Sequence, residues 1–379
     1  MEQSAPARVS SIAETQKIPA VIFANPHSAE KIAALTVLER LIIALHRAGA
    51  GPITVVTPGL LPELRRAKAL RISVEVAPSA PHLEGPTLLA AGNILVQTAD
   101  IKRILQSGSR LMQNGLPLPI GIVHTTSALA AHHNIAIVLE NPATIEAEGA
   151  RLIENKSEAL EAQRALWSSL TGAADGFVDR HFNRPVGRLL SKLLIHTPVS
   201  PNAVSISSII IGVISALFFA EGSYKSALLG AILFQLSAII DCVDGDLARI
   251  LFKESPLGKW IDFWGDQIVH VSVFAGIAFG VLRNGGDKET VWLGLSAIIG
   301  ALLACIVVVR GMRQAADSNG PLQKLINAAT NRDFSVLVLT LAIAQKLPWF
   351  LWLAAIGSHF FWLTALVLQL THKPTPPAR

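Results

Sequence analysis

The chain has 379 residues, room for about two domains, and it is unusually apolar: hydrophobic residues make up 51% and charged residues 16%. Together with a mean hydropathy of +0.47, this composition excludes a single ordinary soluble domain and indicates membrane-spanning segments. The formal net charge of +5 does not indicate nucleic-acid binding, because the basic residues are spread around apolar segments; anionic lipid or phosphate is the expected partner. The two cysteines, Cys242 and Cys305, lie in apolar stretches, which excludes a disulfide framework and a thiolate zinc site.

The N-terminal part alternates short apolar runs with helical periods, which predicts an α/β domain over residues 17–150. Helical spacing predicts one helix over 30–48 and a long surface helix over 143–170, with 151–175 as the linker toward the membrane. The first sixteen residues lack the basic start and apolar core of a signal peptide, so this domain is expected to be cytoplasmic. Strands are expected at AVIFA, ITVVT, TLLAAGNILVQ, IGIVHTT and AIVLE.

Residues 176–199 interleave apolar and basic side chains, which predicts an amphipathic helix at the membrane surface. Residues 200–372 then contain six apolar stretches near the ~20 residues that a span requires, which predicts an all-α transmembrane domain. Basic residues favour the loops on the N-terminal side of the membrane, so both termini are expected in the cytoplasm. The predicted spans are 204–220, 226–245, 262–282, 290–309, the shorter 333–346, and 348–370.

Four carboxylates lie in the otherwise apolar second and third spans, where each charge costs a few kcal/mol. Asp241 and Asp244 are three residues apart and Asp262 and Asp266 are four apart, so each pair shares a helix face. A turn at Pro256 and Gly258 is expected to make the two helices antiparallel and to bring the four carboxylates together near the cytoplasmic surface.

Such a cluster cannot stay fully ionised without cations, and carboxylate oxygens suit Mg²⁺, Mn²⁺ or Ca²⁺, at one or two sites. Gly245 and Ala248 leave space for a ligand near the backbone, and Arg249 is placed to meet a phosphate. Asp246 is about 140° around the helix from Asp241 and is not expected to be a ligand. A proton relay or ion path in a transporter, and structural pairing with Arg249 and Lys259, remain alternatives.

These residues spell D-x2-D-G-x2-A-R-x8-G-x3-D-x3-D without a departure, and the chain from 176 to 372 resembles the CDP-alcohol phosphotransferase family. The resemblance implies that the four aspartates bind two divalent metal ions and that Asp266 is also the general base for the acceptor hydroxyl. It implies contact of Gly245 and Arg249 with the CDP group, with Ala248 and Gly258 as further motif positions. Other donor-site candidates are Ser255 in the loop between the helices and Pro201, Asn202 and Ser205 at the start of the first span.

The segment DGFVDRHFNRPVGRLLS precedes the spans, and the pair Arg332-Asp333 opens the fifth. With these segments, the order of parts resembles the bifunctional inositol-phosphate cytidylyltransferase and di-myo-inositol-phosphate-phosphate synthase. That resemblance implies a nucleotidyltransferase-like, Rossmann-like sheet in the N-terminal domain. A cytidylyltransferase would carry a glycine-rich phosphate loop ending in a lysine, but AVIFANPHSAEK has no glycine before Lys31. Asn93 lies near the position where a metal-binding aspartate would be expected. We therefore expect this domain to have lost catalysis.

The predicted function is a multi-pass membrane transferase that moves a phosphoalcohol group from a CDP-activated donor to a polyol or polyol phosphate and releases CMP. Arg310 and Arg332 favour a phosphorylated acceptor, and the resemblance implies a homodimer. The donor's alcohol stays open between diacylglycerol, archaeol and inositol. An ion-coupled transporter should show internal repeats and broken helices, and an intramembrane prenyltransferase a second aspartate cluster on later spans, where only Asp333 occurs.

Overall fold

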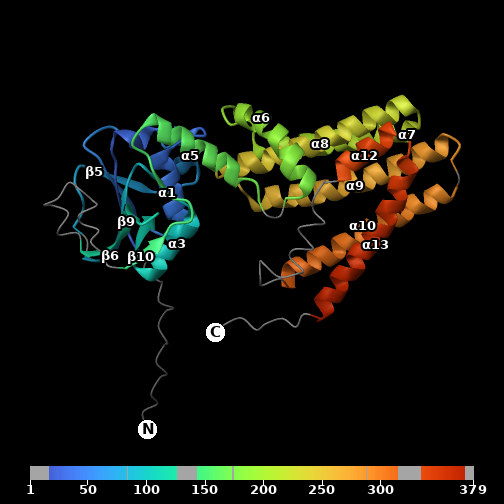
Figure 1. The fold of residues 1–379 in the computed structure, drawn as a ribbon. Coiled ribbons are helices and arrows are strands. Elements are labelled where there is room, and N and C mark those ends of the chain that lie inside the picture. The colour runs from blue at the N-terminus through green and yellow to red at the C-terminus, as the bar shows by residue number, and fades with distance from the viewer. Residues whose placement is uncertain are drawn as a thin grey trace, which may run out of the picture. The chain divides into compact units, whose positions relative to one another are not determined.

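The computed structural model describes residues 17–82, 84–125, 143–172, 175–286, 288–314 and 334–371. The chain divides into two compact units, Met1–Ala165 and Leu166–Arg379. The first is built on a β-sheet and the second on long helices (Figure 1), so the predicted α/β region followed by a helical region is confirmed. The expected strand AIVLE and the residues Arg332 and Asp333 lie outside the described residues.

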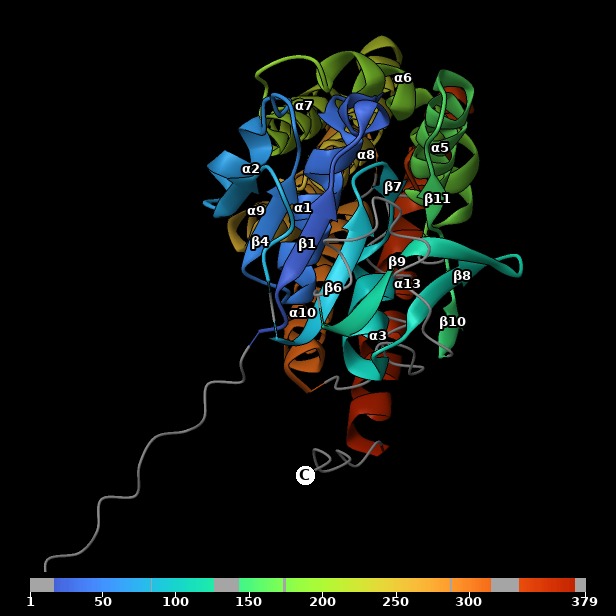
Figure 2. The ribbon, with the colours of Figure 1, turned by 90° about the vertical axis from the view of Figure 1, so that its left-hand side faces the viewer.

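A mostly parallel sheet, with seven strands among the described residues, forms the centre of the first unit (Figure 2). β1 (Ala20–Phe23) is parallel to β4 (Ile53–Val56) and to β6 (Glu84–Ala91), and its first three residues are fully buried, as in a central parallel strand. The strand order is β10-β8-β9-β6-β1-β4-β5, with β5 at Val74–Ala77, β8 at Arg110–Gln113, β9 at Leu116–Thr125 and β10 at Thr144–Glu146, and β9 antiparallel to both neighbours.

Helix α1 (Val37–Ala48) is shorter than the predicted helix over 30–48. Lys31–Ile32 (β2) and Leu35–Thr36 (β3) form an antiparallel hairpin instead, with Ala33 and Ala34 at φ 47° and 71° in its turn. The Thr36 hydroxyl then caps α1 by accepting a hydrogen bond from the Glu39 amide, and Gly49 ends the helix at φ 95°. The helix starts where this cap is available. The other α-helices among the described residues of this unit are α2 (Arg65–Ala69), α3 (Thr98–Ser107) and most of α5 (Lys156–Ser169).

The helix predicted over 143–170 is wrong in its first half. β10 pairs with β8, and β11 (Arg151–Leu152) pairs with β7 (Ile94–Leu95). Asn93 holds the segment after β11 against β7. Its side-chain amide donates to the Ile153 carbonyl at 2.8 Å, and its backbone carbonyl accepts from the Ile153 amide at 3.0 Å. Pairing with distant strands overrides the helical spacing, and the helix begins only at Lys156, where Asn155 accepts a hydrogen bond from the Glu158 amide.

The second unit opens with a π-helical turn, Asp179–Asn183, that continues into α6 (Arg184–Leu194) where an amphipathic helix was expected. The long helices are α7 (Pro201–Glu221), α8 (Tyr224–Ile250), α9 (Pro256–Arg283), α10 (Glu289–Gln314) and α13 (Leu347–Thr371), with the short α12 (Phe334–Ile343) between the last two. The sequence placed a turn at Pro256 and Gly258. The structure corrects this, because Pro256 is the first residue of α9 and Gly258 lies in its first turn.

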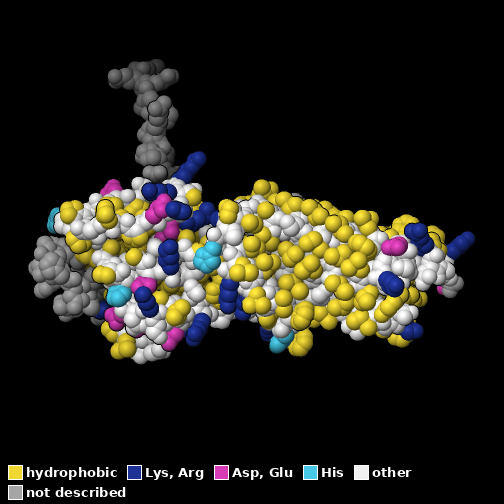
Figure 3. Space-filling view, turned by 90° about the horizontal axis from the view of Figure 1, so that it is seen from above, with side chains coloured by type: hydrophobic (Ala, Val, Ile, Leu, Met, Phe, Trp, Pro, Cys, Tyr) yellow, Lys and Arg dark blue, Asp and Glu magenta, His cyan; other side chains and the backbone are white. Residues whose placement is uncertain are grey.

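Five helices among the described residues are long and apolar enough to cross a membrane, with 21 to 28 residues each: α7, α8, α9, α10 over Glu289–Gly311, and α13. Six spans were predicted; at the place of the fifth, the described residues form the ten-residue apolar α12. Apolar side chains dominate the middle of the helical unit on the face seen in Figure 3, and charged side chains lie mainly toward the two ends of that unit. These features are those of an integral membrane protein.

Helix α7 packs against both α8 and α9, and glycines lie at several of these contacts. A Cβ added at Gly280 of α9 would overlap the Phe219 carbonyl oxygen of α7, and one at Gly276 would overlap the Ala216 carbonyl. A Cβ at Gly230 of α8 would come within 2.9 Å of the Ser215 carbonyl. Small residues therefore allow these three helices to approach closely, as is common where helices associate in membranes.

Replacing Gly280 by alanine should destabilise this packing, because the obstacle is a backbone atom that cannot move independently. We expect Gly280→Ala to lower the free energy of unfolding by about 2 kcal/mol, in the range for overpacking. The measurement is the thermal unfolding midpoint in detergent. Gly357→Ala is the matched control, because a Cβ there meets no atom within 4 Å and alanine favours a helix. Equal midpoints for the two variants would contradict the close approach of α7 and α9.

Candidate active site

Three carboxylates converge where α8 ends and α9 begins. Asp241, Asp244 and Asp262 each offer an oxygen, and these oxygens lie within 4.8 Å of one another. Asp244 is buried at 7% exposure, Asp241 is half-buried, and Asp262 is exposed. Repulsion among three such charges favours a bound cation, and the all-oxygen donor set suits a hard divalent ion. The residues therefore fit a divalent metal site.

Helix α7 supplies two hydroxyl groups to this group of carboxylates. Ser205 donates to an oxygen of Asp244, and Ser208 donates to Asp241 at 3.3 Å. Both serines are buried. Because α8 and α9 each pack against α7, the serines support the α8 carboxylates from the helix that both neighbours share. Ser205 was predicted as a donor-site residue, and Ser208 was missed. The signal for Ser208 was its position one turn after Ser205 in an apolar helix.

The fourth predicted ligand, Asp266, lies one turn beyond Asp262 on α9 and is 8% exposed. It is not among the three residues whose oxygens lie within 4.8 Å. Asp246, which was not expected to bind metal, is completely buried and forms ion pairs with Arg184 and Arg249. The acidic residues of this region thus have two environments. Asp241, Asp244 and Asp262 form a group that could bind a metal ion, whereas Asp246 is paired with arginines.

Several of the predicted donor-site residues lie around the first turns of α7 and α9. Pro201 opens α7, and the Asn202 side-chain oxygen lies 3.0 Å from the position that a Cβ would take at Gly258. The Ser255 hydroxyl caps α9 by accepting from the Gly258 amide at 3.0 Å, which gives Ser255 a structural task of its own. Two helix N-termini therefore come together near the carboxylates, an arrangement that favours anions.

Gly245 and Arg249 lie together on α8. A Cβ at Gly245 would stand 3.4 Å from a terminal guanidinium nitrogen of Arg249, so the guanidinium extends over the glycine backbone. The Arg249 side chain is 41% exposed, and Ala248 beside it is half-buried. Arg310, expected near a phosphorylated acceptor, is exposed near the C-terminal end of α10. Arg332 lies outside the described residues, so its predicted role stays a prediction.

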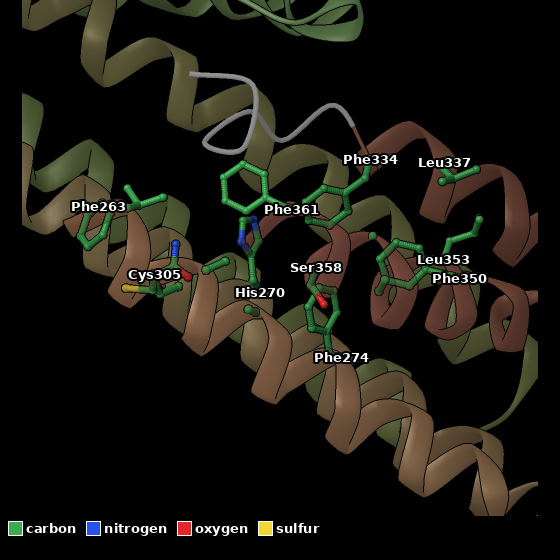
Figure 4. A pocket seen from close by; sticks show the side chains of 16 residues that line it. Phe263, His270, Phe274, Cys305, Phe334, Leu337, Phe350, Leu353, Ser358 and Phe361 are labelled. Atoms are coloured by element: carbon green, nitrogen blue, oxygen red, sulfur yellow. The ribbon is translucent and has the colours of Figure 1, made fainter. Parts of the chain in front are cut away.

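An apolar cavity of about 340 Å³ lies between α9, α10, α12 and α13 (Figure 4). Phe263, Gln267, His270 and Phe274 of α9 line one side, and Ala304 and Cys305 of α10 belong to its other walls. Phe263 directly follows Asp262, and Gln267 directly follows Asp266. The cavity therefore starts at the level of the carboxylates and follows α9 away from them.

The first unit shows no phosphate loop among its described residues. A 3₁₀ turn, Pro26–Ala29, follows β1, with Asn25 and Ser28 capping each other. A Cβ at Gly92 would lie 2.5 Å from the Ser28 hydroxyl, so protein atoms fill the space beside this turn. Lys31 is exposed in β2, and Asn93 is engaged with Ile153.

Residues 198–371 match the model of the CDP-alcohol phosphatidyltransferase family. A curated relative from Thermococcus kodakarensis, named bifunctional IPC transferase and DIPP synthase, is 31% identical over 234 residues, covering 59% of this chain and 52% of the relative. The chain spans 52% of the length of this relative and 40% of the length of the relative of the same name from Archaeoglobus fulgidus.

A phosphatidylinositol phosphate synthase from Streptomyces avermitilis is 28% identical over 181 residues, covering 44% of this chain and 70% of the relative. Among solved structures, the phosphatidylinositol phosphate synthase of Mycobacterium tuberculosis with CDP-DAG bound is 20% identical and has a TM-score of 0.42. It covers 52% of this chain and 98% of its own.

Asp244→Asn should weaken Mn²⁺ binding at least about tenfold, because it removes a charged oxygen from the three-carboxylate group. Asp246→Asn is the matched control: it lies two residues away on the same helix, and its carboxylate faces arginines. The measurement is calorimetric titration of the purified protein with Mn²⁺. Equal weakening by both variants would show that Asp246 belongs to the metal site after all.

Proposed function

Because residues 198–371 form a CDP-alcohol phosphatidyltransferase domain, we propose that the protein transfers a substituted phosphate from a CDP-alcohol donor to a hydroxyl acceptor and releases CMP. The observation that carries this proposal is the convergence of Asp241, Asp244 and Asp262 beside the N-termini of α7 and α9. A carboxylate group of this kind suits metal-bound diphosphate better than a free polyol.

In the proposed reaction, Asp266 takes the proton of the acceptor hydroxyl. The acceptor oxygen then bonds to the β-phosphorus of the donor, the bond from that phosphorus to the bridging oxygen breaks, and CMP leaves. Asp241, Asp244, Asp262 and Asp266 would hold two divalent ions, Mg²⁺ or Mn²⁺, which neutralise charge on the diphosphate. No covalent intermediate with the protein is needed.

The donor's diphosphate would be oriented by Arg249 and by the two helix N-termini. Gly245 leaves the backbone open beneath the Arg249 guanidinium, so a phosphate can approach there. The proposed donor site is completed by Ala248 and by residues at the starts of α7 and α9: Pro201, Asn202, Ser205, Ser255 and Gly258. For the acceptor, we propose that Arg310 and Arg332 favour a phosphorylated molecule. The site and the first unit would face the cytoplasm. Residues 17–150 would form a nucleotidyltransferase-like domain without catalysis, and residues 151–175 would link it to the membrane domain. The protein would assemble as a homodimer.

The cavity favours a donor with a lipid chain over CDP-inositol. It is lined largely by apolar side chains, lies within candidate spans, and begins next to Asp262 and Asp266. An alkyl chain attached to a diphosphate at the carboxylates could follow α9 from Phe263 to Phe274, a rise of roughly 16 Å. The name of the Streptomyces relative, phosphatidylinositol phosphate synthase, supports an inositol-containing acceptor, free or phosphorylated.

Purified protein in detergent should release CMP only when a divalent metal ion, a CDP donor and an acceptor are all present. We expect Asp266→Asn to slow release by about 10²–10⁴-fold, the range for loss of a general base. Glu254→Gln, which changes an exposed carboxylate in the neighbouring loop, should stay near the wild-type rate. CMP release is followed by chromatography with CDP-diacylglycerol or CDP-inositol and a panel of polyols and polyol phosphates. If the wild type binds no cytidine diphosphate compound, the proposed function is wrong and the alternative of an ion-coupled transporter is favoured.

Filling the cavity should separate lipid from soluble donors. Ala304→Trp places a large ring in the cavity, so it should raise the KM for CDP-diacylglycerol about tenfold or more without affecting a short-chain or soluble CDP donor. Leu302→Trp is the control, because Leu302 lies on the same helix, is 46% exposed and does not line the cavity. If Ala304→Trp affects soluble and lipid donors equally, the cavity does not hold the lipid chain.

A further inference from the structure

Asp246 is a buried carboxylate that the proposed metal site does not use. Its side chain is completely buried near the end of α8, between Asp244 and Arg249 in the sequence. A buried charge is tolerated only when it is paired and hydrogen-bonded. Asp246 meets this requirement with groups from two helices.

The first partners come from α6. Arg184 donates to one oxygen of Asp246 at 3.1 Å, and Ser191 donates to the other at 3.3 Å. Arg184 also pairs with Asp175 at 2.6 Å, and its side chain is only 12% exposed. The guanidinium is therefore held between two carboxylates, and its geometry is fixed.

Further contacts attach α6 closely to α8. A Cβ at Gly187 would stand 3.1 Å from the Ile239 carbonyl, and the Gln235 amide donates to the buried Asn183 at 2.6 Å. Phe177, Phe182, Leu189 and Leu193 are exposed on this segment. The side chains of this segment that face α8 are thus small or polar, while its large apolar side chains are exposed on the surface.

The second partner is Arg249. A terminal guanidinium nitrogen of Arg249 lies 3.4 Å from the Asp246 oxygen that Arg184 also contacts. The same nitrogen lies above Gly245. At 41% exposure, the Arg249 side chain keeps part of its guanidinium available to a ligand. One buried carboxylate oxygen therefore connects α6 with the arginine proposed to bind the donor.

We propose that Asp246 is a positioning residue: it holds the Arg249 guanidinium over Gly245, ready for the donor diphosphate, and it does so from a site fixed by Arg184 of α6. This inference rests on the proposed function. Asp246 does not touch the donor; it acts through Arg249. Loss of its charge releases Arg249 from this orientation, so the donor binds less well while the reacting groups stay in place.

The experiment is CMP release at varied donor concentration with saturating acceptor and metal. Asp246→Asn is expected to raise the donor KM about tenfold and to change kcat by less than about threefold. Asp175→Asn is the matched control: it removes the other carboxylate on Arg184 but leaves the Asp246–Arg249 pair, so its donor KM should match the wild type. Mn²⁺ binding should be retained in both variants.

A double-mutant cycle separates positioning from a general loss of stability. In an Arg249→Ala background, Asp246→Asn should cause no further rise in donor KM. If Asp246→Asn does not fold because Arg184 is left in excess, Arg184→Gln/Asp246→Asn removes both charges and should show the same raised KM. An unchanged donor KM in the folded variants, or independent effects at 246 and 249, overturns the inference. If the wild type releases no CMP at all, the proposed function itself has failed.

Discussion

The arrangement of α7, α8 and α9 must compensate the electrostatic repulsion among Asp241, Asp244 and Asp262. Three carboxylate oxygens within 4.8 Å of one another would be unfavourable beside apolar helices without compensation. Serine hydroxyls of α7 and the exposure of Asp262 reduce this repulsion, and the group also suits a divalent cation. Since α7 lies against both α8 and α9, it is the element that fixes the distance between the two acidic helices.

The spacing of the acidic residues made the grouping of Asp241, Asp244 and Asp262 predictable. Fixed intervals along a helix determine which side chains share a face, and no distant contact was needed to expect that Asp241 and Asp244 act together. Long apolar runs identified the spans in the same way, because a bilayer sets their length. The central strand β1 was also found from its run of buried apolar residues.

Features that depend on distant partners were not predictable. Residues 143–152 have helical spacing, but strand partners near Leu111 and Ile94 draw them into β10 and β11. The role of Ser208 depends on α8 lying beside α7, and the pairing of Asp246 with Arg184 joins residues 62 positions apart. Charge and spacing distinguished Asp246 from the proposed metal ligands, but they could not identify its arginine and serine partners.

The small-residue contacts between α7 and α9 bear on how substrates enter and leave. They recur along α9 from Gly258, beside Asn202, through Gly265, beside Ile209, to Gly280, beside the Phe219 backbone. Separating two helices joined at so many points would break every contact at once, so we expect α7 and α9 to stay together. The apolar cavity lies instead among α9, α10, α12 and α13, so a bulky molecule that reaches it from the bilayer would have to pass between those helices.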